Sequence, residues 1–321
     1  MNSAPKLIPM RPAYGRALVA LGAANPDVVV LSADVSNSDF SFLFQEAYPD
    51  RFYNVGIAEQ ALVDVAAGLA YAGKIPFANT FAFLFATRAL EMVRTHLCYG
   101  GANVKLMAAY AGISDSFDGP THHSVCDIAI MRSLPNMTIV VPSDTAIMEA
   151  LLPQIADWAG PVYCRLNRNE VPLLHDTARG EARIGRAISV RPGTDVTIIA
   201  AGLMVGRSLE AATMLQSQGI SAAVLDMHTI KPLDVEAVMG SARATGALVT
   251  AEEHSVIGGL GGAVAEVVGA EMPVPVVRVG LPDCFAESGP YGAILDRYGM
   301  SVQDIIEAAR RSIAGKRWNL R

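Results

Sequence analysis

Charged residues are scarce in this sequence, and basic ones are scarcer than acidic ones. Asp, Glu, Lys and Arg together make up 17% of the 321 residues, with 25 Lys and Arg against 31 Asp and Glu, for a formal net charge of -6. A chain without a basic surplus lacks the positive patch that binding to a phosphate backbone requires. We therefore expect no nucleic-acid partner.

Cysteines and long apolar runs are also scarce. The uncharged run IPFANTFAFLFAT is shorter than the roughly 18 to 20 residues that a membrane-spanning helix needs. The N-terminal segment has no apolar core followed by a small-residue cleavage site. The cysteines are far apart and form no C-x-x-C pair, which argues against a disulfide framework and a zinc site. We expect a cytoplasmic protein without a membrane partner.

Hydrophobic residues are abundant at 51%, a balance that points to extra buried surface such as a subunit interface. The length exceeds what one core usually supports, so two domains are expected. A polar passage rich in Pro, Gly and charge follows residue 166. We predict a first domain over residues 1–175, a linker over 176–192 and a second domain over 193–321.

Runs of β-branched residues alternate with segments of helical period, which is typical of α/β domains with a mostly parallel sheet flanked by helices. In the first half, strands are predicted at 27–34, 75–81, 104–110, 137–143 and 161–166, and helices at 11–23, 58–72, 83–97 and 145–158. In the second half, strands are predicted at 196–202, 221–227, 247–253 and 274–280, and helices at 205–218, 235–244, 259–270 and 301–314.

Glu59 is a carboxylate in apolar surroundings, within FYNVGIAEQALVDVAAGLAYAG. It begins a predicted helix whose Leu62, Val65 and Leu69 follow the spacing of a buried face. An acid in a first turn often complements the helix dipole. The residues alone leave open whether Glu59 does this or is kept for chemistry.

Several other polar residues have equally plain explanations. Asp118, His122 and His123 in SDSFDGPTHHS could be solvated loop residues, and adjacent histidines lack the spacing of a metal site, so no metal ligand is predicted. GGLGGAVAE matches a dinucleotide-binding pattern weakly, and close helix packing explains its glycines. His228 and His254 are predicted to be structural or interface residues.

Five segments, in order, resemble the transketolase family of thiamine-diphosphate enzymes, which includes 1-deoxyxylulose-5-phosphate synthase. VGIAEQ with GLAYAGKIPFANTF resembles the pyrimidine-binding domain, and DGPTHHSVCDIAIMRSLPNMTIVVPSD resembles its D-G-P-T-H loop. DMHTIKPLD and VTAEEHSVIGGLGGAVAE are similar to the C-terminal transketolase domain. The resemblance covers almost the whole chain and implies these two domains in this order.

The resemblance also implies roles for individual residues. Glu59 would share a proton with N1′ of the cofactor's aminopyrimidine and so activate the cofactor. Phe81, preceded by Thr80 as in the family, would stack on that ring. Asp118 would accept hydrogen bonds from a substrate hydroxyl, and His122 would act as a catalytic residue that contacts the donor sugar or its phosphate.

At the far end of the substrate, Arg11 and Arg168 match positions where transketolases hold a sugar phosphate, since planar guanidinium groups suit its oxygens. Ser36, or alternatively Ser38, matches the family's phosphate-binding serine. Tyr110 departs from the family, because a substrate-binding histidine commonly stands there. The phosphate end or the substrate length is therefore expected to differ.

A G-D-G motif, which in full-length transketolases marks the domain that holds the diphosphate and Mg²⁺, does not occur in this sequence. The chain thus resembles the pyrimidine-binding plus C-terminal half of a split transketolase. The expected partner is a separate N-terminal subunit carrying the diphosphate and metal site, in an α2β2 assembly. The expected reaction is transfer of a two-carbon ketol unit from a ketose or ketose phosphate to an aldose.

Three alternatives stay open. A β subunit of a 2-oxoacid dehydrogenase E1 shares this domain pair, although DGPTHHS is the pattern of the sugar-using branch. Half of a deoxyxylulose-phosphate synthase is a second alternative. The third is a cofactor-binding or regulatory module without activity of its own.

Overall fold

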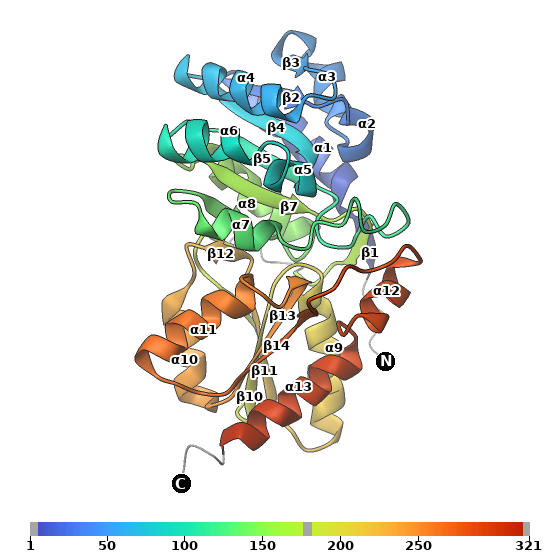
Figure 1. Cartoon of the computed structure of the whole chain (residues 1–321), viewed down its shortest axis with the longest axis vertical. Helices are drawn as coiled ribbons and strands as arrows, with labels where there is room; N and C mark the ends of the chain where they lie inside the picture. Colours follow the sequence, from blue (N-terminus) through green and yellow to red (C-terminus); the bar gives the residue numbers. More distant parts are fainter. Residues whose placement is uncertain (1–5, 176–181, 317–321) are drawn as a thin grey trace.

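Two α/β domains stacked end to end form the molecule, as the computed structural model in Figure 1 shows. The structure describes residues 6–175 and 182–316. The first sheet and its helices occupy the N-terminal half, and the second sheet with its helices occupies the C-terminal half. This is the predicted fold class of two domains with mostly parallel sheets.

The first sheet has seven strands in the order β12-β6-β7-β5-β4-β2-β3. All of its pairings are parallel except that between β12 and β6. Residues of the parallel strands β2, β5 and β7 are buried throughout, as expected for a sheet covered on both faces. The strands are β2 (Val28–Ser32), β3 (Phe52–Asn54), β4 (Ile75–Phe81), β5 (Lys105–Ala109), β6 (Thr138–Val140), β7 (Val162–Leu166) and β12 (Thr229–Lys231).

Helices cover both faces of this sheet, with α1 packed beside α8 on one face and α4 on the other. Asp144 caps α8 by accepting a hydrogen bond from the Ile147 backbone N–H at 2.9 Å. The helices are α1 (Met10–Ala24), α2 (Ser36–Asp39), α3 (Phe42–Ala47), η1 (Pro49–Arg51), α4 (Glu59–Tyr71), α5 (Ala82–Ala86), α6 (Leu90–Met92), η2 (Val93–Tyr99), α7 (Asp127–Ser133) and α8 (Thr145–Asp157).

The single helix predicted over residues 83–97 is wrong. The chain forms the short helix α5, a break around Thr87 and Arg88, the single turn α6 and then the π-helix η2. The apolar spacing of this segment is helical throughout, so local pattern alone does not reveal the break. The break matters because it gives Arg88 a position outside any regular helix.

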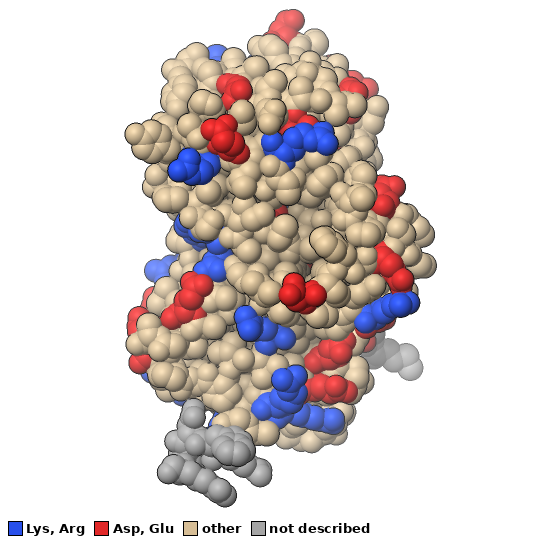
Figure 2. Space-filling model, in the orientation of Figure 1, with Lys and Arg blue, Asp and Glu red and all other residues tan. Residues whose placement is uncertain are grey.

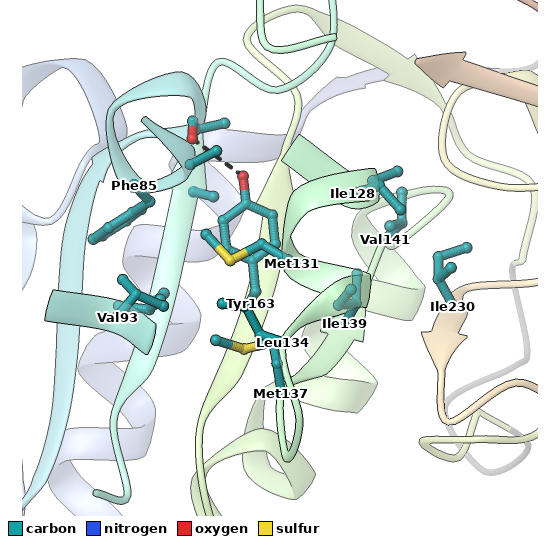
Figure 3. Close-up of a cluster of buried hydrophobic side chains, with 14 of the residues drawn as sticks. Phe85, Val93, Ile128, Met131, Leu134, Met137, Ile139, Val141, Tyr163 and Ile230 are labelled. Carbon is teal, nitrogen blue, oxygen red and sulfur yellow. Dashed lines mark hydrogen bonds between the residues drawn. The ribbon is translucent and has the colours of Figure 1, made fainter. Parts of the chain in front are cut away.

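A core of aliphatic and aromatic side chains fills the space between this sheet and the helices α5 and α7. Figure 3 shows Tyr163 at its centre, with Phe85 and Ile139 nearby. The Tyr163 hydroxyl lies 2.7 Å from Asp127 Oδ2 and 3.3 Å from the Ala82 carbonyl oxygen. This buried hydroxyl is thereby satisfied, and it ties β7 to the starts of α5 and α7.

The second sheet has the order β14-β13-β10-β11-β9, parallel except for the β11–β9 pair. Its strands are β9 (Ile188–Arg191), β10 (Val196–Ala200), β11 (Ala222–Asp226), β13 (Leu248–Ser255) and β14 (Val276–Leu281). Its helices are α9 (Met204–Ser217), α10 (Val235–Thr245), α11 (Leu260–Glu271), α12 (Tyr291–Arg297) and α13 (Val302–Gly315).

Two strands cross the boundary expected from the sequence. Strand β9 lies within the predicted linker but is an edge strand of the second sheet. Residues 176–181 of that linker lie outside the described residues. Strand β12 belongs by sequence to the second domain but pairs with β6 of the first. A small antiparallel pair of β1 (Leu7–Pro9) and β8 (Glu170–Pro172) completes the fold. The domain boundaries stay a prediction.

On the face shown in Figure 2, acidic and basic side chains are interspersed over a surface that is mostly uncharged. Within residues 6–175 and 182–316, no helix combines the length and apolar character needed to span a membrane.

Glu253, at the end of β13, joins the two domains through buried hydrogen bonds. Its Oε1 accepts from the Ile113 backbone N–H at 2.8 Å, and its Oε2 accepts from the Tyr291 hydroxyl at 2.8 Å and from Asn167 at 3.3 Å. Burial raises the pKa of the Glu253 carboxyl to about 7, while Arg165 and these donors oppose the rise. Keeping this buried carboxyl ionised therefore lowers the stability of the folded chain, and the loss grows as pH rises.

We predict that Glu253→Gln changes the pH dependence of stability. Because the pKa of Glu253 is raised on folding, the wild-type chain loses stability as pH rises from about 4.5 to about 7, on the order of 2 kcal/mol, and the variant lacks this loss. Urea unfolding at pH 5 and pH 8 measures this change in the free energy of unfolding for wild type and variant. Glu46→Gln, at an exposed position, is the control. Parallel pH profiles for wild type and Glu253→Gln would contradict the prediction.

Candidate active site

Glu59 is the first residue of α4, directly after the turn that follows β3. Its side chain is 1% exposed, and it faces a cavity of about 410 Å³. The N-terminus of α4 favours a carboxylate here. The Glu59 carboxylate can therefore complement the helix dipole and also be available for chemistry. A buried acid next to an open cavity has the means to act on a ligand.

The cavity lies at the carboxyl ends of β2 and β4, where ligands of parallel sheets usually bind. It brings together three residues singled out from the sequence, Glu59, Phe81 and His122. Its walls are mostly apolar. The lining residues are Ala33, Asp34, Val35, Ile57, Glu59, Phe81, Phe83, Leu84, Arg88, Thr121 and His122.

Arg88 pairs with Glu59 and was not singled out in the sequence. Its Nη1 donates to Glu59 Oε2 at 3.0 Å, and its side chain is 53% exposed while that of Glu59 is 1% exposed. The guanidinium group therefore compensates a carboxylate that water does not reach. Its position depends on the break between α5 and α6, which is why the prediction of one continuous helix hid it.

Aromatic side chains line one side of the site. The Phe81 ring lies 4.5 Å from the Tyr110 ring and 6.3 Å from the His122 ring, measured between centroids. Phe83 lies 5.2 Å from His122, and His122 Nδ1 is 3.0 Å from the Thr121 hydroxyl. Phe81 and Phe83 thus line the cavity, whereas nearby Phe85 is buried in the core.

The loop of residues 111–124 packs against the second domain. Gly112 and Gly119 have positive φ angles of 65° and 82°. A Cβ atom on Gly112 would lie 2.4 Å from the Glu253 carboxylate, and one on Gly119 would lie 2.1 Å from the Ser288 hydroxyl. These two glycines let the loop approach the second domain closely.

The predicted loop residues occupy different environments. Asp118 is exposed, with its Oδ2 3.5 Å from Arg168 Nη1, and it is not among the residues that line the cavity. His123 is 8% exposed, and neither ring nitrogen has a hydrogen-bond partner. Burial lowers the pKa of His123, although the nearby Asp115 backbone opposes this.

Arg11 and Arg168 both pack against Tyr110. Arg11 Nε donates to the Arg168 carbonyl oxygen at 2.9 Å, and Arg11 Nη1 donates to the Tyr110 hydroxyl at 3.0 Å and to the Ser38 carbonyl oxygen. The two guanidinium carbons lie 5.1 and 4.9 Å from the Tyr110 ring centroid. Ser36 begins α2 near this cluster, and the contact with Arg11 comes from Ser38.

The glycine-rich segment at the start of α11 is occupied by a protein carboxylate. Glu252 accepts hydrogen bonds from the Leu260 and Gly261 backbone N–H groups at 2.7 and 2.8 Å. Close packing explains the glycines, since a Cβ on Gly259 would lie 2.0 Å from Glu252 Oε2. His228 and His254 are buried and hydrogen-bonded to their neighbours, away from the cavity lining.

The fold is that of a two-domain α/β protein, and its cavity places an acid and an aromatic ring at the carboxyl ends of parallel strands. The sequence matches the family of the transketolase pyrimidine binding domain over residues 6–172 and that of the transketolase C-terminal domain over residues 185–305. The chain belongs to the transketolase family, and this confirms the predicted family.

Similar proteins include subunits of transketolases that are encoded as two chains. The 6-deoxy-6-sulfo-D-fructose transketolase subunit SqwH of Clostridium sp. (strain MSTE9) is 42% identical over 300 residues, 94% of this chain and 93% of that protein. One of the subunits of the apulose-4-phosphate transketolase of Phocaeicola vulgatus is 39% identical over 306 residues, 95% of this chain and 98% of that protein.

A solved structure agrees with this. It is described as a split gene transketolase in an inactive beta4 tetramer, and it superposes with a TM-score of 0.90 at 49% identity, over 96% of this chain and 99% of the other. The predicted assignment to the C-terminal subunits of split transketolases is confirmed at this level. These matches do not favour the dehydrogenase or synthase alternatives.

We predict that Arg88→Met destabilises the chain. The substitution leaves the buried Glu59 carboxylate without its cation, at a cost of about 1–3 kcal/mol, reduced from that of a fully buried pair because Arg88 is half-exposed. Urea unfolding followed by circular dichroism measures the loss. Arg94→Met, at an exposed position of η2, is the matched control. Equal stability of the two variants would contradict the prediction.

Proposed function

We propose that this chain is the pyrimidine-binding subunit of a two-subunit transketolase that moves a two-carbon ketol unit from a ketose or ketose phosphate to an aldose. The observation that carries the proposal is the buried Glu59 carboxylate, which faces a cavity shared with Phe81 and His122. Family membership supplies the reaction class, and the geometry supplies residues for it.

The residues present fit the aminopyrimidine half of thiamine diphosphate. A flat, uncharged ring with a basic nitrogen needs an aromatic surface and an acid, and the cavity offers Phe81 and Glu59. When bound, the cofactor supplies the carbon nucleophile that cleaves the ketose. Ile57 and Leu84 add apolar wall to the cavity that the buried carboxyl group faces.

In this proposal, Glu59 holds and exchanges a proton with the ring nitrogen, and low water access strengthens that hydrogen bond. His122 contacts the substrate from the same cavity, and Asp118 accepts a hydrogen bond from a sugar hydroxyl. Arg11, Arg168 and Ser36 contact the end of the substrate that lies farthest from the cofactor. The family match supports these roles, and the cavity lining supports those of Glu59 and His122.

The cofactor's diphosphate and its Mg²⁺ need a different set of ligands. Among the described residues, no three His, Cys, Asp or Glu side chains gather as a metal site. Arg88, a cation of the cavity lining, is already paired with Glu59. We propose that a separate N-terminal subunit holds the charged half of the cofactor and that the working form is an α2β2 heterotetramer. The four free cysteines agree with the cytoplasmic location that we propose.

Glu59→Gln is expected to lower kcat of the assembled enzyme about 10²- to 10⁴-fold, because an amide cannot exchange a proton with the ring. Ketol transfer is measured by a coupled assay, and assembly by light scattering. Glu46→Gln, an exposed acid, is the control and keeps full activity. An active Glu59→Gln enzyme with intact assembly would remove Glu59 from the mechanism.

Activity is expected to depend on the partner. The purified chain with thiamine diphosphate and Mg²⁺ should show no ketol transfer, and titration with the partner subunit should raise activity to a plateau at a one-to-one ratio. Sedimentation of the mixture tests the heterotetramer. Full activity of the chain alone would refute the two-subunit arrangement.

A further inference from the structure

Tyr110 stands between the cofactor cavity and the two arginines. Its ring lies 4.5 Å from the Phe81 ring, measured between centroids, and also contacts both guanidinium groups, and its side chain is 7% exposed. Arg11 and Arg168 are not among the residues that line the cavity. A substrate that extends from the cavity toward the arginines meets the Tyr110 ring first.

Protein groups already bond to both arginines, and for Arg168 these groups are acids. Arg168 pairs with the buried Asp115 and lies 3.5 Å from Asp118. Arg11 uses its Nε and Nη1 donors on two carbonyl oxygens and the Tyr110 hydroxyl. Asp39, fully buried, adds a further acid that interacts with Arg11. Two guanidinium groups with Asp115 and Asp118 sum to zero charge before Asp39 is counted.

This balance suits a substrate end without a large negative charge. A phosphate monoester is a dianion at neutral to alkaline pH, so placing it here would set it against Asp115 and Asp118. A sugar hydroxyl can use the remaining guanidinium donors without that repulsion. The position of Tyr110 against Phe81 and both arginines and the pairing of Arg168 with Asp115 are separate observations that point to the same property.

We infer that this enzyme selects aldose acceptors whose far end is an uncharged hydroxyl over their phosphorylated counterparts, with Tyr110 and Asp115 as the specificity-determining residues. The inference rests on the proposed transketolase function. It differs from the sequence-based expectation, in which Arg11 and Arg168 hold a sugar phosphate.

The test compares D-erythrose with D-erythrose 4-phosphate as acceptors for the assembled enzyme with thiamine diphosphate and Mg²⁺. The assay is run at pH 8, because burial and Asp118 raise the pKa of Asp115 to about 7 against the opposing effect of Arg168. The expected result is a higher kcat/KM for erythrose. A tenfold or greater preference for erythrose 4-phosphate would overturn the inference while leaving the proposed function intact.

Asp115→Asn removes the charge at constant volume and is expected to raise the ratio of kcat/KM for erythrose 4-phosphate over erythrose at least about tenfold. Tyr110→Ala is expected to shift the ratio in the same direction by removing the ring that contacts both guanidinium groups. Asp50→Asn, at an exposed position of η1, is the control and leaves the ratio unchanged. An Asp115→Asn enzyme with the wild-type ratio would contradict the charge argument.

A binding measurement separates the two proposals. If neither acceptor reacts, the proposed function fails, and calorimetry of the wild-type assembly with each sugar still decides the specificity. Tighter binding of erythrose 4-phosphate than of erythrose would overturn the inference, and the reverse order would support it. The wild-type comparison requires no variant to fold.

Discussion

The buried ion pair between Arg165 and Asp127 holds the site's surroundings together. Arg165 Nε and Nη2 donate to the two Asp127 oxygens at 2.9 and 3.0 Å, and both side chains are at most 5% exposed. The same guanidinium group donates to the Ser124 and Glu253 carbonyl oxygens. One residue of β7 thus fixes the start of α7, the end of the 111–124 loop and the second domain. Loss of either partner would leave an uncompensated buried charge, so this arrangement is strongly specified.

Much of the fold could be predicted because its parallel strands are buried on both faces and appear in the sequence as β-branched runs. β4 has the predicted bounds, and the site falls at the strand ends, where the predicted Glu59, Phe81 and His122 meet. The residues that escaped prediction depend on distant contacts. Arg88 lies in a break that local periodicity does not show, and the short strands β9 and β12 exist through their pairing with β11 and β6.

The Arg11, Tyr110 and Arg168 stack illustrates a second limit of sequence reasoning. The three residues come from α1, the end of β5 and the end of β7, so no local pattern joins them. Sequence reasoning recognised each arginine and noted Tyr110 as a departure. It could not find Asp115, since an acid in a polar loop carries no signal until the fold places it against Arg168.

A common electrostatic rule connects the cavity and the arginine cluster. In the cavity, Arg88 is matched by Glu59, and beside Tyr110, Arg168 is matched by Asp115. Pairing of this kind stabilises buried charges but leaves little free positive charge for a ligand. The cations that bind a diphosphate are therefore expected on another chain, which supports a partner subunit. A substrate phosphate would likewise lack an unpaired cation at Arg168. The two proposals thus share one property of the chain, namely that Arg88 and Arg168 are already paired with its own acids.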